Sequence, residues 1–268
     1  MREAEDAERE EQVILVDAGN TNTIFGVLIG DELVESFRLS TDRERTADEY
    51  GALLLPLFRH RGLDPTATDA LLISSVVPPI HPTIGRLAQQ YFHTQALFIE
   101  PGIRTGMAIR YDNPSEVGAD RIVNSVAARH LFGAPVVVVD FGTATTFDIV
   151  NSAGEYAGGI ITPGIGISAE ALFAQASRLY RVDIRKPEEL VGRNTGAAMQ
   201  SGIYYGYTSL VDGILRRLKM EIPGLRKVVA TGGQAELIAG GSEFIQEVCP
   251  QLTLLGLQLI YDLNRTRR

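Results

Sequence analysis

The chain has 268 residues, of which 45% are hydrophobic and 22% are charged, and its formal net charge is -8 at pH 7. This length is enough to bury the core of one large domain or of two smaller ones. The negative charge argues against nucleic acid as a partner, because an acidic surface repels phosphodiester backbones. A single cysteine, Cys249, excludes a disulfide framework and a multi-cysteine metal site, as expected of a cytoplasmic protein. No apolar stretch approaches the roughly 20 residues that cross a bilayer, so we expect no membrane partner.

The first twelve residues are mostly acidic and contain no apolar segment, which predicts a solvated tail over residues 1–12 and no signal peptide. Apolar or alternating segments at residues 13–16, 23–28 and 33–39 are separated by turn-forming sequences at residues 17–21 and 30–31. This pattern predicts an antiparallel meander of three strands. A helix at 47–61, a strand at 70–77, a helix at 81–92 and a strand at 96–99 are predicted to follow.

The same pattern returns in the second half of the chain, with strands at residues 136–139, 146–150 and 156–161. Aligning Asp17 with Asp140 also aligns Gly19 with Gly142 and Thr23 with Thr146. This internal duplication predicts an α/β protein with two similar domains, each a mixed sheet flanked by helices. We expect the domains to cover residues 13–125 and 126–268, with a helix at 115–132 that bridges them.

The second half is predicted to finish with helices at residues 167–176, 196–220, 234–239 and 256–263. Strands are expected at 227–230 and 252–255.

The turn after residue 16 is suited to binding phosphate. Gly19 lets the backbone approach an anion, and the amides and hydroxyls around Asn20, Thr21 and Thr23 can donate hydrogen bonds. Asp17 could hold Mg²⁺ through water, since this ion prefers carboxylates and keeps several waters. A simple hairpin turn is the alternative. The second copy, with Asp140, Gly142, Thr143 and Thr145, favours a pair of loops that hold one polyphosphate.

Asp120 and Arg121 lie in the first turns of a helix that the sequence Asn113-Pro114-Ser115 could introduce. Asp120 could be a general base for a hydroxyl nucleophile, and Arg121 could hold an anion by a forked hydrogen-bond pair. Alternatively, Asp120 compensates the helix dipole and Arg121 is a surface cation. Three glycine-containing segments, at residues 158–164, 192–195 and 231–234, could line a substrate or nucleotide, or could be only turns and helix caps.

Six motifs together resemble those of type III pantothenate kinases, over about residues 13–261. They are Asp17-x-Gly19-Asn20-Thr21, Asn113-Pro114 with Gly118-x-Asp120-Arg121, Asp140-x-Gly142-Thr143-Ala144, Gly158-Gly159 with Pro163-Gly164, Gly192-x-Asn194-Thr195, and Thr231-Gly232-Gly233.

The resemblance implies the duplicated ribonuclease-H-like fold of actin, sugar kinases and Hsp70. It also implies ATP-dependent phosphorylation of pantothenate to 4′-phosphopantothenate, the first step of coenzyme A synthesis. The ATP site would comprise Asp17, Ala18, Gly19, Asn20, Thr21, Asn22, Thr23, Ile24 and Thr143. Asp120 would accept the proton of the pantothenate hydroxyl. Pantothenate would be surrounded by Tyr111, Gly118, Ala119, Asp120, Arg121 and Thr195.

The same resemblance implies that Asp140 binds a monovalent cation, K⁺ or NH₄⁺, in addition to the Mg²⁺ that accompanies ATP. It implies a homodimer with the site near the subunit interface, where Thr195 could reach across from the partner. Two alternatives remain open on the sequence alone. One is a nucleotide-binding regulatory protein of the same fold, and the other is a kinase for a different polyol or sugar, because the fold alone does not choose the acceptor.

Overall fold

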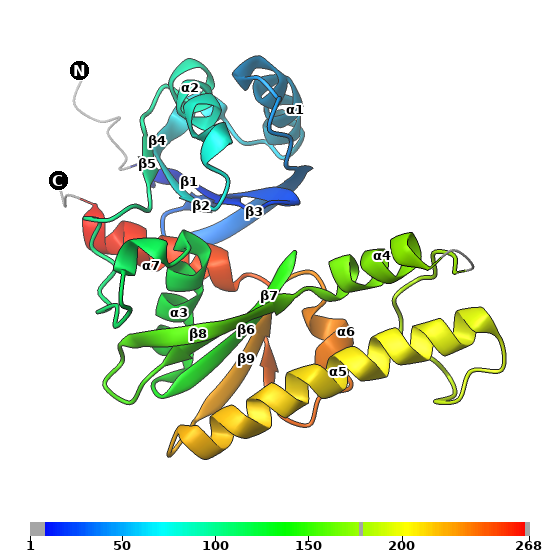
Figure 1. Ribbon diagram of the computed structural model, residues 1–268. Helices are drawn as coiled ribbons and strands as arrows, with labels where there is room; N and C mark the ends of the chain where they lie inside the picture. Colours follow the sequence, from blue (N-terminus) through cyan, green and yellow to red (C-terminus); the bar gives the residue numbers. More distant parts are fainter. Residues whose placement is uncertain (1–8, 177–178, 266–268) are drawn as a thin grey trace, which may run out of the picture. The chain divides into compact units, whose positions relative to one another are not determined.

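The computed structural model describes residues 9–176 and 179–265, which divide into two compact units (Figure 1). The first unit contains the described parts of residues 1–104, 118–123 and 257–268. The second contains Thr105–Val117 and Asn124–Gly256. Helices α3 (Ala119–Phe132) and α7 (Leu252–Asn264) contribute residues to both units. The domain boundary predicted between residues 125 and 126 stays a prediction, as does the acidic tail, of which residues 1–8 lie outside the described part.

The first unit has a five-stranded mixed sheet in the order β3-β2-β1-β4-β5. The predicted meander is confirmed, because β1 and β2 pair antiparallel, as do β2 and β3. Strands β4 and β5 extend the sheet in parallel. The elements are β1 (Gln12–Ala18), β2 (Asn22–Ile29), β3 (Glu32–Ser40), α1 (Ala47–His60), η1 (Pro65–Ala67), β4 (Thr68–Ser75), η2 (Pro78–Ile80), α2 (His81–Tyr91) and β5 (Ala96–Phe98).

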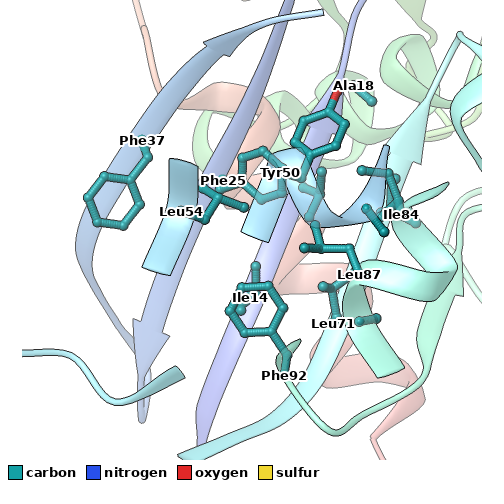
Figure 2. Packing of buried hydrophobic residues seen from close by; sticks show 14 of the residues in the cluster. Ile14, Ala18, Phe25, Phe37, Tyr50, Leu54, Leu71, Ile84, Leu87 and Phe92 are labelled. Carbon is teal, nitrogen blue, oxygen red and sulfur yellow. The ribbon is translucent and has the colours of Figure 1, made fainter. Parts of the chain in front are cut away.

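Helices α1 and α2 cover one face of this sheet and form its core with alternate strand residues (Figure 2). Ile14 and Phe25 from the strands meet Tyr50 and Leu54 of α1 and Leu87 of α2, and all five are fully buried. Since strand side chains alternate between faces, the residues of β1 between these core positions point to the opposite face. Asp17 is one of them, and this alternation sets its direction away from the helices.

The second unit repeats the same arrangement with the order β10-β9-β6-β7-β8. Here β6, β7 and β8 form the antiparallel meander, and β9 and β10 extend it in parallel. The internal duplication is therefore confirmed at the level of topology. The elements are η3 (Pro114–Glu116), β6 (Val136–Phe141), β7 (Ala144–Val150), β8 (Tyr156–Pro163), α4 (Ile165–Gln175), α5 (Thr195–Glu221), β9 (Lys227–Thr231), α6 (Ala235–Ala239) and β10 (Glu247–Val248).

The second core lies between this sheet and helices α5 and α6. Val139 and Ala230 of the parallel strands are fully buried, and Val211 and Leu215 of α5 pack in the same cluster with Ile238 of α6. The 27-residue α5 begins at Asn194, whose side chain accepts a hydrogen bond from the Ala197 amide. This cap fixes the first turn of α5, where Thr195 lies.

Two predictions about local structure are wrong. Residues 252–255 form the first turn of α7 instead of a strand, so the last helix starts at Leu252. The bridging helix begins at Ala119 instead of residue 115, because Asn113 caps a separate 3-10 turn at Pro114–Glu116. Among the described residues, no helix is both long and apolar enough to pass through a lipid bilayer.

Candidate functional site

The first glycine turn joins β1 to β2 and is closed by short backbone contacts. The Gly19 amide donates to the Asn22 carbonyl at 3.0 Å, and the Thr41 hydroxyl donates to the Gly19 carbonyl at 2.6 Å. A Cβ atom on residue 19 would lie 3.2 Å from the Asn22 carbonyl oxygen, which favours glycine there. Asn20 and Thr21 are exposed at the tip. The turn therefore offers exposed polar groups on a fixed backbone, as a phosphate site requires.

Asp17 lies at the carboxyl end of β1, opposite Ser74 of the parallel strand β4. Paired residues of neighbouring strands point to the same face, so the half-buried carboxylate and the fully buried Ser74 hydroxyl share the face away from α1 and α2. The carboxyl ends of parallel strands are where open sheets bind ligands. The Asp17 carboxylate therefore lies at the end of the sheet where a phosphate ligand could bind.

Asp120 lies in the first turn of α3, within the same compact unit as Asp17. A Cβ atom on Gly118 would come within 2.6 Å of the Asp120 Oδ1 atom and within 3.5 Å of Val76, which directly follows β4. Gly118 therefore leaves room for the Asp120 carboxylate and lies beside the residue that follows β4. Asp17 lies at the same end of the neighbouring strand β1.

Burial raises the pKa of the Asp120 carboxyl above its ordinary value of 3.8, although the hydrogen bond from the Arg121 amide at 2.8 Å and the Arg121 charge act in the opposite direction. The residue keeps a partly exposed surface. A carboxylate with a raised proton affinity, in a residue that is not fully buried, is suited to accept a proton. Arg121 is only 7% exposed, so the alternative of a surface cation is wrong.

The second glycine turn joins β6 to β7 and is closely approached by Gly164. Gly142 donates to the Ala144 carbonyl at 3.0 Å, and Gly164 donates to the Thr143 carbonyl at 3.1 Å. A Cβ atom on Gly164 would lie 2.3 Å from the Thr143 carbonyl oxygen. Thr143 itself is exposed at the tip. The segment at residues 158–164 therefore contacts this turn through the Gly164 amide.

The two turns differ in length by one residue. Ala18 pairs with Thr23 across the first turn, whereas Phe141 pairs with Thr145 across the second. The structural partner of Thr23 is therefore Thr145, and the predicted match with Thr146 is wrong. Both Thr23 and Thr145 are buried, at 0% and 1% exposure.

The duplication extends to a hydroxyl beside each strand-end carboxylate. Asp140 lies opposite Thr231 of β9, as Asp17 lies opposite Ser74 of β4, and both hydroxyl residues are buried. The following residue differs, because β9 is followed by Gly232, whose positive φ of +91 belongs to a tight turn. Sequence periodicity did not single out Ser74, since it lies inside an apolar strand.

The remaining predicted substrate residues lie in the second unit. Tyr111 packs on Tyr156, with ring centroids 6.4 Å apart, and a Cβ atom on Gly158 would touch its ring at 3.9 Å. Gly158, with φ of +114, therefore leaves room for Tyr111. Thr195 is exposed at the start of α5 and lines a surface cavity of about 510 Å³ together with Leu172, Leu179, Ala198, Met199, Gly202 and Ile203.

Comparison with known proteins decides between the functional classes that the sequence left open. The family model for type III pantothenate kinases matches residues 13–217. A type III pantothenate kinase from Halalkalibacterium halodurans is 52% identical over 252 residues, which cover 94% of this chain and 99% of that protein. One from Myxococcus xanthus is also 52% identical, over 94% of this chain and 98% of its own. The chain belongs to the type III pantothenate kinase family.

Solved structures support the fold of this family member. A protein of Campylobacter jejuni described as a Baf-family transcriptional activator aligns with a TM-score of 0.59, at 21% identity and over 94% of this chain and 98% of its own. MreB 5 of Spiroplasma citri, solved with AMPPNP bound, aligns with a TM-score of 0.54, at 10% identity and over 94% of this chain and 96% of its own. The predicted duplicated, actin-like α/β fold is confirmed.

Proposed function

We propose that the chain transfers the γ-phosphoryl group of ATP to the 4′-hydroxyl of pantothenate, the first step of coenzyme A synthesis. Membership of the type III pantothenate kinase family over residues 13–217 supports this reaction. The observation that carries the mechanism is the carboxylate of Asp120, which lies against Gly118 and whose pKa is raised by burial. Phosphoryl transfer needs little beyond positioning, charge neutralisation and a group to accept the hydroxyl proton.

In this proposal the Asp120 carboxylate accepts the proton of the attacking hydroxyl, which directs the oxygen lone pair toward phosphorus. Arg121 binds the pantothenate carboxylate, because its guanidinium can form two parallel hydrogen bonds with an anion. Gly118 and Ala119 line the acceptor beside the base. Tyr111 and Thr195 supply further contacts to pantothenate, and the packing of Tyr111 on Tyr156 supports a fixed ring orientation.

The ATP phosphates are assigned to residues 17–24 and to Thr143. The exposed Asn20, Thr21 and Thr143 support this assignment, since each lies at the tip of a glycine turn. Asp17 is proposed to hold Mg²⁺ through water, and Asp140 to bind K⁺ or NH₄⁺.

The single carboxylates of Asp17 and Asp140 fit cations that also contact the phosphates of a bound ligand. Among residues 9–176 and 179–265, no group of three or more histidine, cysteine, aspartate or glutamate side chains could hold a metal. A single carboxylate at each position suits Mg²⁺, which keeps several waters and is bound through one or two carboxylates plus substrate phosphates. When bound, the ions would neutralise the charge of the transferred group.

The proposal includes a homodimer in which Thr195 comes from the partner subunit, and a cytoplasmic location, where ATP is available. The apolar residues around Thr195 at the α4–α5 cavity support a contact there, because exposed apolar patches mark interaction sites.

The central experiment measures ADP release with pantothenate, with glucose and without an acceptor, at fixed ATP and Mg²⁺. We expect release only with pantothenate, and we expect replacement of K⁺ by Na⁺ to slow it. Faster release with glucose would assign a sugar kinase instead. A gel shift with DNA at physiological salt, together with no ADP release in the presence of any acceptor, would favour the regulatory alternative over the enzyme.

A further inference from the structure

A buried asparagine in the middle of α3 links the carboxylate of Asp140 to the first turn of α7. The Asn124 side chain is 0% exposed. Its Nδ2 atom donates to Asp140 Oδ2 at 3.1 Å, and its Oδ1 atom accepts from the Thr253 hydroxyl at 2.8 Å. All three residues lie in the second compact unit. A buried amide that uses its donor and its acceptor on two different elements is held in one orientation.

The Asp140 carboxylate decides which end of the Asn124 amide faces it, and Thr253 holds the other end. An ionised carboxylate only accepts hydrogen bonds, so the amide must present nitrogen to Asp140 and oxygen to Thr253. If the Thr253 hydroxyl were removed, the amide would lose the partner of its oxygen. The orientation of Asn124 therefore depends on a residue that is 129 positions away in the sequence.

The other oxygen of Asp140 faces the glycine turns. A Cβ atom on Gly232 would lie 2.6 Å from Asp140 Oδ1, and one on Gly142 would lie 3.9 Å from the same atom. With Oδ2 directed to Asn124, Oδ1 is directed to the turn that carries Thr143 and to the turn after β9. One oxygen of the carboxylate therefore faces the turn that we assign to ATP.

We propose that Asn124, held by Thr253, is a positioning residue that fixes the Asp140 carboxylate for a monovalent cation. This inference rests on the proposed function, in which Asp140 binds K⁺ or NH₄⁺. A neutral donor suits this role, because it orients Asp140 without adding a positive charge that would compete with the cation. A hydrogen-bonding partner behind a cation ligand commonly sets both the orientation and the affinity of that ligand.

The test uses Thr253→Val and Asn124→Leu in the full chain. Titration calorimetry measures binding of the magnesium complex of AMPPNP at increasing K⁺, and steady-state assays measure the half-activating K⁺ concentration and the KM for pantothenate. We expect each variant to raise the K⁺ requirement of both nucleotide binding and activity by about tenfold or more, as for outer partners of metal ligands. The KM for pantothenate at saturating K⁺ should stay at the wild-type value. Such a split would not result from general destabilisation.

Two further variants separate positioning from packing. Thr253→Ser keeps the hydroxyl and should restore the wild-type K⁺ requirement. Thr208→Val removes another hydroxyl, in α5, which donates to the Tyr204 carbonyl at 2.9 Å, and should leave the K⁺ requirement unchanged. If Asn124→Leu does not fold, Thr253→Val still decides, because Thr253 is only partly buried.

An unchanged K⁺ requirement in Thr253→Val, or an equal rise in Thr208→Val, would overturn the positioning role while leaving the kinase intact. Nucleotide binding and turnover of the wild type that do not respond to K⁺ would remove the cation from Asp140, and the inference with it. No ADP release by the wild type with pantothenate would instead contradict the proposed function itself.

Discussion

Asp120 combines two properties that a proton acceptor needs. Burial raises the pKa of its carboxyl, which increases its affinity for a proton, and its residue still keeps an exposed edge. Gly118, directly before α3, leaves space for the carboxylate in this position. The same geometry makes two separate predictions, one about turnover and one about stability.

Replacing Asp120 by asparagine should lower turnover by about two orders of magnitude or more, in line with the contribution of a general base. Binding of AMPPNP, measured by calorimetry, should be retained. In the wild type, activity requires the ionised carboxylate. Since its pKa is raised, kcat/KM should fall with decreasing pH at a higher pH than the ordinary 3.8 of aspartate would give. Wild-type turnover in Asp120→Asn would remove the base assignment.

The same substitution should raise the unfolding temperature near neutral pH. A carboxyl whose pKa is higher in the folded state costs stability once it ionises, and that cost sets in as the pH rises through the window between the unfolded and folded pKa values. Below 3.8 the carboxyl is protonated in both states, so the difference between wild type and Asp120→Asn should disappear there. Thermal unfolding from pH 3 to pH 8 measures it. The exposed Asp112→Asn is the control, and a lower melting temperature for Asp120→Asn at neutral pH would contradict the prediction.

Among the elements, the turn between β9 and α6 shows why the two copies of the repeat are not interchangeable. Strand β4 ends at Ser75 and leads to a proline-containing 3-10 turn. Strand β9 ends at Thr231 and is followed by Gly232, which approaches the Asp140 carboxylate and the Phe141 carbonyl. A side chain at this position would enter the space of Asp140. The second copy therefore keeps an open glycine turn beside its carboxylate.

Gly232→Ala should weaken nucleotide binding and destabilise the fold. Its Cβ atom would lie 2.6 Å from both Asp140 Oδ1 and the Phe141 carbonyl oxygen, and φ is +91. Gly224→Ala is a matched control, because its φ of +71 imposes a similar backbone cost of about 1 kcal/mol without any atom within 4 Å of the new Cβ. Calorimetry and thermal unfolding should show a loss of nucleotide affinity only in Gly232→Ala. Equal behaviour of the two variants would show that the close approach to Asp140 is unimportant.

The elements that could be predicted from sequence are those that local patterns determine. Alternating strands, glycine turns and their repetition gave the meander and the duplication. The strand predicted at residues 252–255 is a helix turn, because a short apolar run fits a strand and a buried helix turn equally well. Strand β10 has two residues and forms only by pairing with β9. Asn124 could not be recognised, since its partners Asp140 and Thr253 meet it only in the folded chain.

The number of chains that build one active site is a property of the whole molecule. Thr195 is exposed at the capped start of α5, beside an apolar cavity of about 510 Å³. A homodimer repeats the same patch on both subunits, so a residue near the symmetry axis can serve the partner's site. In that arrangement, Asp120 and Thr195 of one active site belong to different chains.

Mixing two inactive variants distinguishes the arrangements. Asp120→Asn removes the base, and Thr195→Arg places a bulky charged side chain at an exposed position where it should block pantothenate without disturbing the core. If each site uses residues of both chains, a mixed dimer has one doubly defective site and one intact site. Random exchange of equal amounts should then restore about a quarter of wild-type activity, because half of the dimers are mixed. If one chain supplies both residues, every site in the mixture carries a defect, and activity should stay at the level of the separate variants. A molar mass from light scattering that corresponds to a monomer, together with full wild-type turnover, would reject the shared site altogether.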